Sequence, residues 1–148
     1  MTFSCSVDIN APIGTVVSLF DNIGNMKKWQ DGFKSHEHIS GIPGTAGAKS
    51  KLVYDTGKHV IELTETIQNK QLPKEMTALY EHTHMVNTLT TSFTELPGGK
   101  TRYTTTIDYT KFIGFMPKLM SILMPGVFKK QAQKWADQFK VFVEQAVN

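Results

Sequence analysis

Histidine pairs are the feature of this sequence with the clearest potential for chemistry. Four of its five histidines form two His-x-His pairs, His36 with His38 and His82 with His84. Side chains two residues apart share one face of a β-strand, so each pair would present two imidazoles, which are common zinc ligands. Within 33–40, however, the apolar residues hold odd-numbered positions, which predicts that His36 and His38 face outward. No carboxylate can be assigned to orient either pair, so we expect no metal site and no cofactor.

Three titratable side chains are candidates for acid–base chemistry: Glu37, Glu65 and again His82. The alternation of apolar residues in their predicted strands places all three on inner faces. An inward carboxylate close to an inward imidazole would form a catalytic pair with shifted pKa values. Two alternatives stay open: these groups orient a bound ligand, or they have structural roles near the strand ends.

Other catalytic and cofactor-binding motifs are missing. The sequence contains no G-x-S-x-G, H-E-x-x-H or G-x-G-x-x-G pattern. The glycine-rich run 44–50 is similar to a phosphate loop, but its spacing differs and it leads into a predicted strand, so no helix N-terminus would face a phosphate. Cys5 is the single cysteine, which excludes a disulfide within the chain and a zinc site built on cysteines.

The elements that position these groups are mostly strands. Alternating apolar residues predict a first strand over 3–9, after which Pro12 favours the first turn of a short helix, with a second short helix over 26–30. From 33 to 111, β-branched residues and regularly spaced turns predict an antiparallel meander, because parallel strands would need long connections. Its six strands are expected at 33–40, 48–55, 59–68, 74–84, 86–95 and 101–111.

The last part of the chain changes to a helical pattern. Residues 112–128 are mostly apolar but contain Pro117, Pro125 and Gly126, so they are too short and too interrupted for a membrane-spanning helix. An amphipathic helix follows from Val127. Its apolar stripe consists of Phe128, Ala132, Trp135, Phe139, Phe142, Val143 and Ala146.

This order of elements predicts an α+β fold. We expect one domain over 1–148, in which a curved seven-stranded antiparallel sheet wraps around a long C-terminal helix, with two short helices after the first strand. A sheet curled around one helix leaves space between the two. An apolar cavity in that space is a site for a small molecule.

Several stretches along the chain are similar to one known family. They are Val7-Asp8-Ile9-Asn10-Ala11-Pro12, then Val16, Phe20, Asp21 and Trp29, a Gly41…Gly47 turn, and the closing helix from Phe128 to Ala146. In this order they resemble the SRPBCC superfamily, also called the START-like helix-grip superfamily. It is described as polyketide cyclase/dehydrase-like and lipid-transport-like. The resemblance implies a deep cavity between sheet and C-terminal helix that binds hydrophobic ligands, in proteins that include lipid carriers, ligand sensors and cyclases.

We therefore predict that the chain binds a small hydrophobic ligand, a lipid, a polyketide-like molecule or similar, for carriage or sensing. Two alternatives remain: a cyclase- or dehydratase-type enzyme that uses the same cavity, and a protein–protein adaptor. The residues expected to contact the ligand are Trp29, Ile39, Leu52, Tyr54, Ile61, Leu63, Ala78, Tyr80, Leu89, Phe93, Tyr103, Ile107, Met116, Met120, Met124, Phe128 and Trp135.

The net charge of the chain bears on its binding partners, and its N-terminal residues bear on its cellular compartment. A net charge of +3 is too small to indicate nucleic acid. The first residues lack the basic and apolar regions of a signal peptide, so we expect the protein to be cytoplasmic.

The segment 111–140 is basic and contains an apolar stretch. It has six lysines and one acidic residue, and residues 112–126 within it are mostly apolar. We expect this stretch to gate the cavity; transient contact with an anionic membrane is the alternative to lysines that are merely solvated. The sequence leaves the oligomeric state open.

Overall fold

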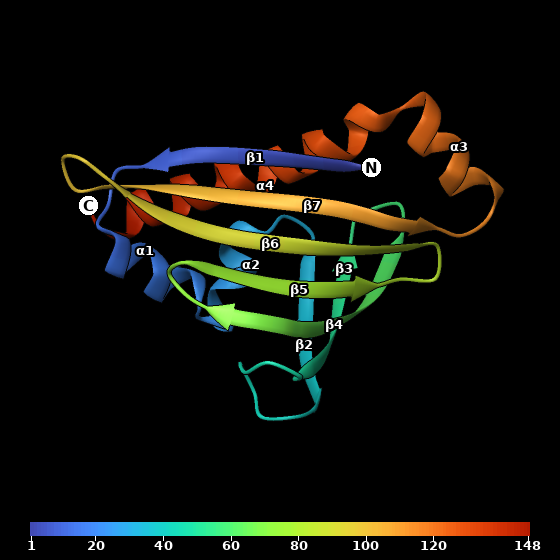
Figure 1. Cartoon of the computed structure of the whole chain (residues 1–148), viewed down its shortest axis with the longest axis horizontal. Coiled ribbons are helices and arrows are strands. Elements are labelled where there is room, and N and C mark those ends of the chain that lie inside the picture. The colour runs from blue at the N-terminus through green and yellow to red at the C-terminus, as the bar shows by residue number, and fades with distance from the viewer.

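The computed structural model describes residues 1–148 and has the α+β helix-grip fold that the sequence predicts. Its elements are β1 (Thr2–Ile9), α1 (Ile13–Phe20), the 3-10 turn η1 (Ile23–Asn25), α2 (Met26–Trp29), β2 (Phe33–Ser40), β3 (Lys49–Asp55), β4 (Val60–Gln71), β5 (Glu75–Glu81), β6 (Met85–Leu96), β7 (Lys100–Phe112), α3 (Phe115–Leu123) and α4 (Pro125–Ala146). The strands form one antiparallel sheet in the order β1-β7-β6-β5-β4-β3-β2. The sheet curls so that β2 and β3 run across the direction of β6 and β7, and α4 lies behind β1 and β7 (Figure 1).

The two C-terminal helices follow from where the prolines stand. Pro125 is the first residue of α4, where its missing N–H costs no hydrogen bond, so the helix begins two residues before the predicted Val127. Pro117 lies in the first turn of α3 and is tolerated there for the same reason. No helix combines the length and the apolar content needed to cross a lipid bilayer.

The densely packed part of the interior lies where α1, α2 and the second half of α4 meet the sheet. The ring centroid of the fully buried Phe139 lies 4.9 Å from that of Trp29 and 5.1 Å from that of Tyr103. Phe20 packs edge-on against Phe139 at 5.8 Å and against Phe93 at 5.2 Å. Such edge-to-face contacts add to the free energy of burying the rings, so this cluster fixes the three helices on one end of the sheet.

The outer face of the sheet is polar, which explains the threonine-rich segments. Hydroxyls on neighbouring strands pair across it, with Ser4 Oγ 2.8 Å from Thr106 Oγ1 and Thr77 Oγ1 3.0 Å from Thr90 Oγ1. The apolar inner face is therefore the side available for a hydrophobic ligand.

Strand β2 contains a β-bulge that the sequence pattern does not reveal. In its ladder with β3 the register shifts between Phe33 and Ser35, so Lys34 is an extra residue on β2. An extra residue exchanges the two faces of a strand for the positions that follow, because side chains alternate with a period of two.

The bulge overturns the predicted orientations along β2. His36 is half-buried and lines the cavity. His38 lines it too, although it is exposed, whereas the exposed Glu37 and Ile39 do not line it. The prediction of an inward Glu37 and outward His36 and His38 was wrong, because it carried the parity of Phe33 through the bulge.

Candidate ligand-binding cavity

A cavity of about 890 Å³ lies between the inner face of the sheet and α4. It exists because α4 packs mainly along β1 at one side of the sheet and α1 packs on β6 and β7, which leaves most of the inner faces of β3 to β5 without a covering helix. The wall is largely aromatic and aliphatic. All four tyrosines of the chain contribute to it: Tyr54, Tyr80, Tyr103 and Tyr109.

Most residues predicted to contact a ligand lie on this wall. They are Trp29, Tyr54, Ile61, Leu63, Tyr80, Leu89, Tyr103, Ile107, Phe128 and Trp135, together with the acid–base candidates Glu65 and His82. Three others are buried outside the wall: Leu52, Ala78 and Phe93. Ile39 is exposed instead of facing the cavity, because β2 is bulged. Met116 and Met120 of α3 and the following Met124 are exposed too, because α3 stands off the sheet (Figure 1).

Further wall residues were not among the predicted ligand contacts, although the sequence pattern placed Met76 and Tyr109 on inner faces. Alternation along predicted strands could have found the inward-facing Ser50, Met76, Met85, Asn87, Thr91, Thr105 and Tyr109. His36 and Lys70 could not have been found in this way. Each follows a register shift, the second between Ile67 and Asn69 on β4.

The strongest polar feature of the cavity is the carboxylate of Glu65. The hydroxyl of Tyr80 donates a 2.6 Å hydrogen bond to Glu65 Oε2, and His36 Nε2 lies 3.9 Å from Glu65 Oε1. The side chains of His36 and Glu65 are only 14% and 12% exposed. Burial, with the nearby negative charge of Glu65, raises the pKa of Tyr80 well above its ordinary value, so Tyr80 is a neutral donor. Three strands thus bring a carboxylate, a phenol and an imidazole together inside an apolar wall.

Tyr54 and Trp135 form a second aromatic element beside this cluster. Their rings stack with centroids 5.4 Å apart, and Tyr54 Oη donates a 2.8 Å hydrogen bond to Gln30 Oε1. Burial, followed by the charge of Glu65, raises the pKa of Tyr54. The stack joins α4 to β3 across the cavity.

On the β6–β7 side, the wall carries hydroxyl groups instead of charge. Thr91 and Thr105 lie opposite each other in the ladder and face the cavity with Tyr103, whose pKa is raised to about 12 by burial. Thr105 Oγ1 and Trp29 Nε1 are buried without a hydrogen-bond partner. Buried polar atoms are normally paired, so these two atoms are exceptions in the interior.

His82 is separate from Glu65, and no hydrogen bond or ion pair joins them. It follows the last residue of β5, and its Nδ1 accepts a 3.2 Å hydrogen bond from the backbone N–H of His84. Burial, and then the proximity of His84, lowers the pKa of His82. The imidazole next to the cavity carboxylate is therefore His36, not the predicted His82. No three His, Cys, Asp or Glu side chains converge on a point that could hold a metal ion.

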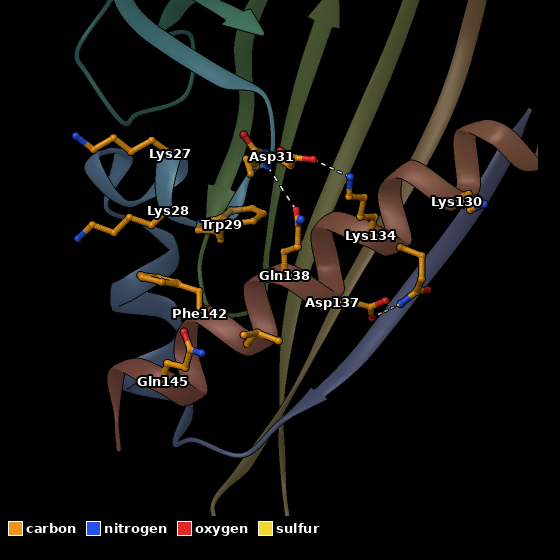
Figure 2. Close-up of a pocket in the computed structure, with 13 residues that line it drawn as sticks. Lys27, Lys28, Trp29, Asp31, Lys130, Lys134, Asp137, Gln138, Phe142 and Gln145 are labelled. Carbon is orange, nitrogen blue, oxygen red and sulfur yellow. Dashed lines mark hydrogen bonds and ion pairs between the residues drawn. The ribbon is translucent and has the colours of Figure 1, made fainter. Parts of the chain in front are cut away.

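Asp31 closes one side of the cavity by joining the α2–β2 connection to α4 (Figure 2). Its carboxylate accepts a 2.7 Å hydrogen bond from Lys134 Nζ, which lowers the pKa of Asp31. Its backbone carbonyl accepts from Trp135 Nε1 at 3.3 Å, and its N–H donates to Gln138 Oε1 at 3.4 Å. Outside this closure lies a surface groove of about 710 Å³ between α2 and α4, and Trp29 lines both spaces.

Comparison with known proteins identifies the fold. No known protein-family profile matches the sequence. No curated protein sequence matches it either. Among solved structures, the TTHA0849 protein from Thermus thermophilus superposes with a TM-score of 0.81 at 17% identity, over 100% of both chains.

Two other solved structures with the same fold are an aromatase/cyclase and a START superfamily protein. The Zhui aromatase/cyclase from Streptomyces sp. R1128 has a TM-score of 0.84 at 11% identity, over 100% of this chain and 96% of its own. A START superfamily protein from Mycobacterium smegmatis has a TM-score of 0.72 at 10% identity, over 95% of this chain and 98% of its own. The chain therefore has the SRPBCC/START-like fold, as the resemblance in its sequence predicts.

Proposed function

We propose that the protein binds one small hydrophobic molecule in the cavity and holds it through a hydrogen-bond donor directed at Glu65. The cavity volume of about 890 Å³ lies within the range of small-molecule sites, roughly 300–1,000 Å³. Mostly apolar walls with a few convergent polar groups are typical of such sites. Carriage or sensing of the ligand needs no further chemistry.

The observation that carries this proposal is the single hydrogen bond of the Glu65 carboxylate. Two carboxylate oxygens have acceptor sites for about four hydrogen bonds, and only the Tyr80 hydroxyl donates to them here. A ligand hydroxyl or ammonium group would occupy the remaining sites. A ligand carboxylate would be repelled, and the repulsion is strong because the site is shielded from water. The favoured ligand is thus an apolar molecule with a hydroxyl or an amine, and without a negative charge.

Two matched fluorescent probes test this preference. N-phenylnaphthylamine is neutral, whereas anilinonaphthalene sulfonate carries the same rings with an added negative charge. We expect saturable binding of the neutral probe at one site, about tenfold or more tighter than binding of the sulfonate. Glu65→Gln should reduce this difference, because it removes the charge and keeps the shape.

A pair of tryptophan substitutions tests whether the cavity is the site. Leu63→Trp fills the cavity from β4, and Leu79→Trp places the same group on the outer face of the neighbouring strand β5. We expect Leu63→Trp to weaken both probes and Leu79→Trp to leave both unchanged. Equal binding to both variants would refute the cavity site, and equal affinity for the two probes would refute recognition by Glu65.

A second candidate function is proton-transfer chemistry of the cyclase or dehydratase type. It is favoured by the 3.9 Å approach of His36 Nε2 to Glu65 Oε1, which places an imidazole beside a carboxylate inside the cavity. In the dehydration of a β-hydroxy ketone, one group would take the proton α to the carbonyl and the other would protonate the departing hydroxyl, which leaves as water.

Turnover separates the two functions. A β-hydroxy aryl ketone can be followed by the absorbance of the enone that dehydration produces. An enzyme would form enone, and His36→Gln would abolish turnover while the neutral probe still binds. A carrier or sensor would bind the probe and form no enone above the buffer rate.

A further inference from the structure

We propose that the protein docks on anionic lipid bilayers through α3 and its two flanks. The docking surface, called the α3 patch below, consists of the exposed apolar side chains of Ile113, Phe115, Met116, Met120, Ile122, Leu123, Met124 and Val127. The proposal is independent of the proposed function, because it concerns the outside of the molecule and is tested without a cavity ligand.

The α3 patch is far more exposed than apolar side chains usually are when they gather together. Phe115, Ile122 and Leu123 are 77%, 75% and 67% exposed, and no residue from Ile113 to Val127 is buried. Scattered exposed apolar residues are normal, whereas a contiguous group marks a surface that meets a partner or a membrane. Figure 1 shows α3 standing off the sheet at one end of the molecule, where it is free to meet such a surface.

The charges around the patch favour a lipid partner. Lys111, Lys118, Lys129 and Lys130 lie within or beside it, and none of them forms an ion pair. No Asp or Glu occurs between Tyr109 and Ala136. Lysine is depleted in protein–protein interfaces, but lysines beside an apolar helix are what an anionic bilayer attracts. The charge complementarity therefore points to a bilayer instead of another protein.

Docking at this position would bring the lipid surface next to the cavity. Val127 belongs to the α3 patch and also lines the cavity, and the next residue, Phe128, lines it too. Ile113 N donates a 2.7 Å hydrogen bond to His84 O, which ties the beginning of this segment to the β5–β6 turn near His82 of the cavity wall. A hydrophobic ligand could thus move between bilayer and cavity without crossing water.

Co-sedimentation with lipid vesicles tests the proposal on the protein without any added ligand. We expect binding to vesicles of phosphatidylcholine with phosphatidylglycerol at low salt, and much weaker binding at high salt or to phosphatidylcholine alone. Lys129→Glu with Lys130→Glu should reduce partitioning about 25-fold or more, at about fivefold for each lysine lost. Ile122→Ser with Leu123→Ser should reduce it as well, through loss of apolar contact.

The matched control makes the same charge change elsewhere. Lys27→Glu with Lys28→Glu alters two exposed lysines of α2 (Figure 2), which do not belong to the α3 patch, and should leave specific docking through α3 nearly intact. Absence of binding to anionic vesicles at low salt would overturn the proposal, as would equal losses in the two lysine double variants. Self-association that Leu123→Ser disperses, without vesicle binding, would instead assign the patch to a second copy of the chain.

Discussion

The two halves of α4 have opposite relations to the rest of the molecule. In the C-terminal half, Ala136, Phe139 and Val143 are at most 1% exposed and belong to the same core cluster as Val16 of α1. In the N-terminal half, no residue from Pro125 to Gln131 is buried, and the helix borders the cavity and the α3 patch. One helix thus joins a packed end to a hollow end. Stability concentrated at the packed end leaves the hollow end free to open, bind and contact other surfaces.

Hydrogen exchange should show this contrast most strongly. Amides of 113–126 have few buried neighbours and should exchange through local opening, whereas those at the centre of α4 should require global unfolding. For a typical domain stability of about 5–15 kcal/mol the two protection factors differ by several orders of magnitude. Equal protection of 113–126 and 136–143, measured by mass spectrometry, would contradict the division into two ends.

A large-to-small change at the packed end should have the largest effect on equilibrium stability. Phe139→Ala removes a fully buried ring that contacts Phe20, Trp29 and Tyr103. We expect a loss of about 3–5 kcal/mol in the free energy of unfolding, measured by urea denaturation. A loss below about 1 kcal/mol would mean that the cluster is not the core of the fold.

Alkaline pH should destabilise both ends, because each contains a tyrosine whose pKa is raised by burial. Burial raises the pKa values of Tyr103 and Tyr109 to about 12, against 10.0 for an exposed phenol. The folded state therefore keeps protons that the unfolded state releases, so the full stability is present below pH 10 and is lost as pH rises towards 12. The expected loss is about 1.4 kcal/mol per pH unit for each residue. Denaturation curves combined with tyrosinate absorbance would check it; tyrosinate formed near pH 10 with unchanged stability would contradict it.

Trp135 lies between the two ends, and its replacement should lower the free energy of unfolding by an intermediate amount. It is half-buried, stacks on Tyr54 and donates to the carbonyl of Asp31. One aromatic pair and one hydrogen bond together contribute about 1–3 kcal/mol, so Trp135→Ala should cost that amount and not the 3–5 kcal/mol of a fully buried tryptophan. Trp135→Phe, which keeps a smaller aromatic ring and loses the donor, should recover part of the loss in the same assay.

Substitutions in the α3 patch should have the smallest effect on the free energy of unfolding. Leu123 is 67% exposed, so Leu123→Ala should change the free energy of unfolding by less than about 0.5 kcal/mol. A loss comparable to that of Phe139→Ala would show that α3 folds back onto the molecule in solution and that the patch is covered. The same urea denaturation experiment would thus decide whether the hollow end is open.

The local periodicity of apolar residues predicted most of the fold. Alternation along β1, the turn residues between later strands and the 3.6-residue stripe of α4 all depend on neighbours in sequence. These signals gave the order of elements and the apolar side of each one. They also placed Glu65 and Tyr80 on the inner face, since the strands that carry them are regular at those positions. They failed at β2, where one extra residue reversed the faces of His36 and Glu37.

By itself, the sequence determined that a curved antiparallel sheet faces one long amphipathic helix, because each element records its own buried side in the spacing of its apolar residues. Only the tertiary structure decided what fills the space between them. Whether Phe139 is packed and Phe115 is exposed depends on which distant segments arrive beside them. The meeting of Glu65, Tyr80 and His36 likewise depends on the register between three strands, which bulges set and local patterns do not record.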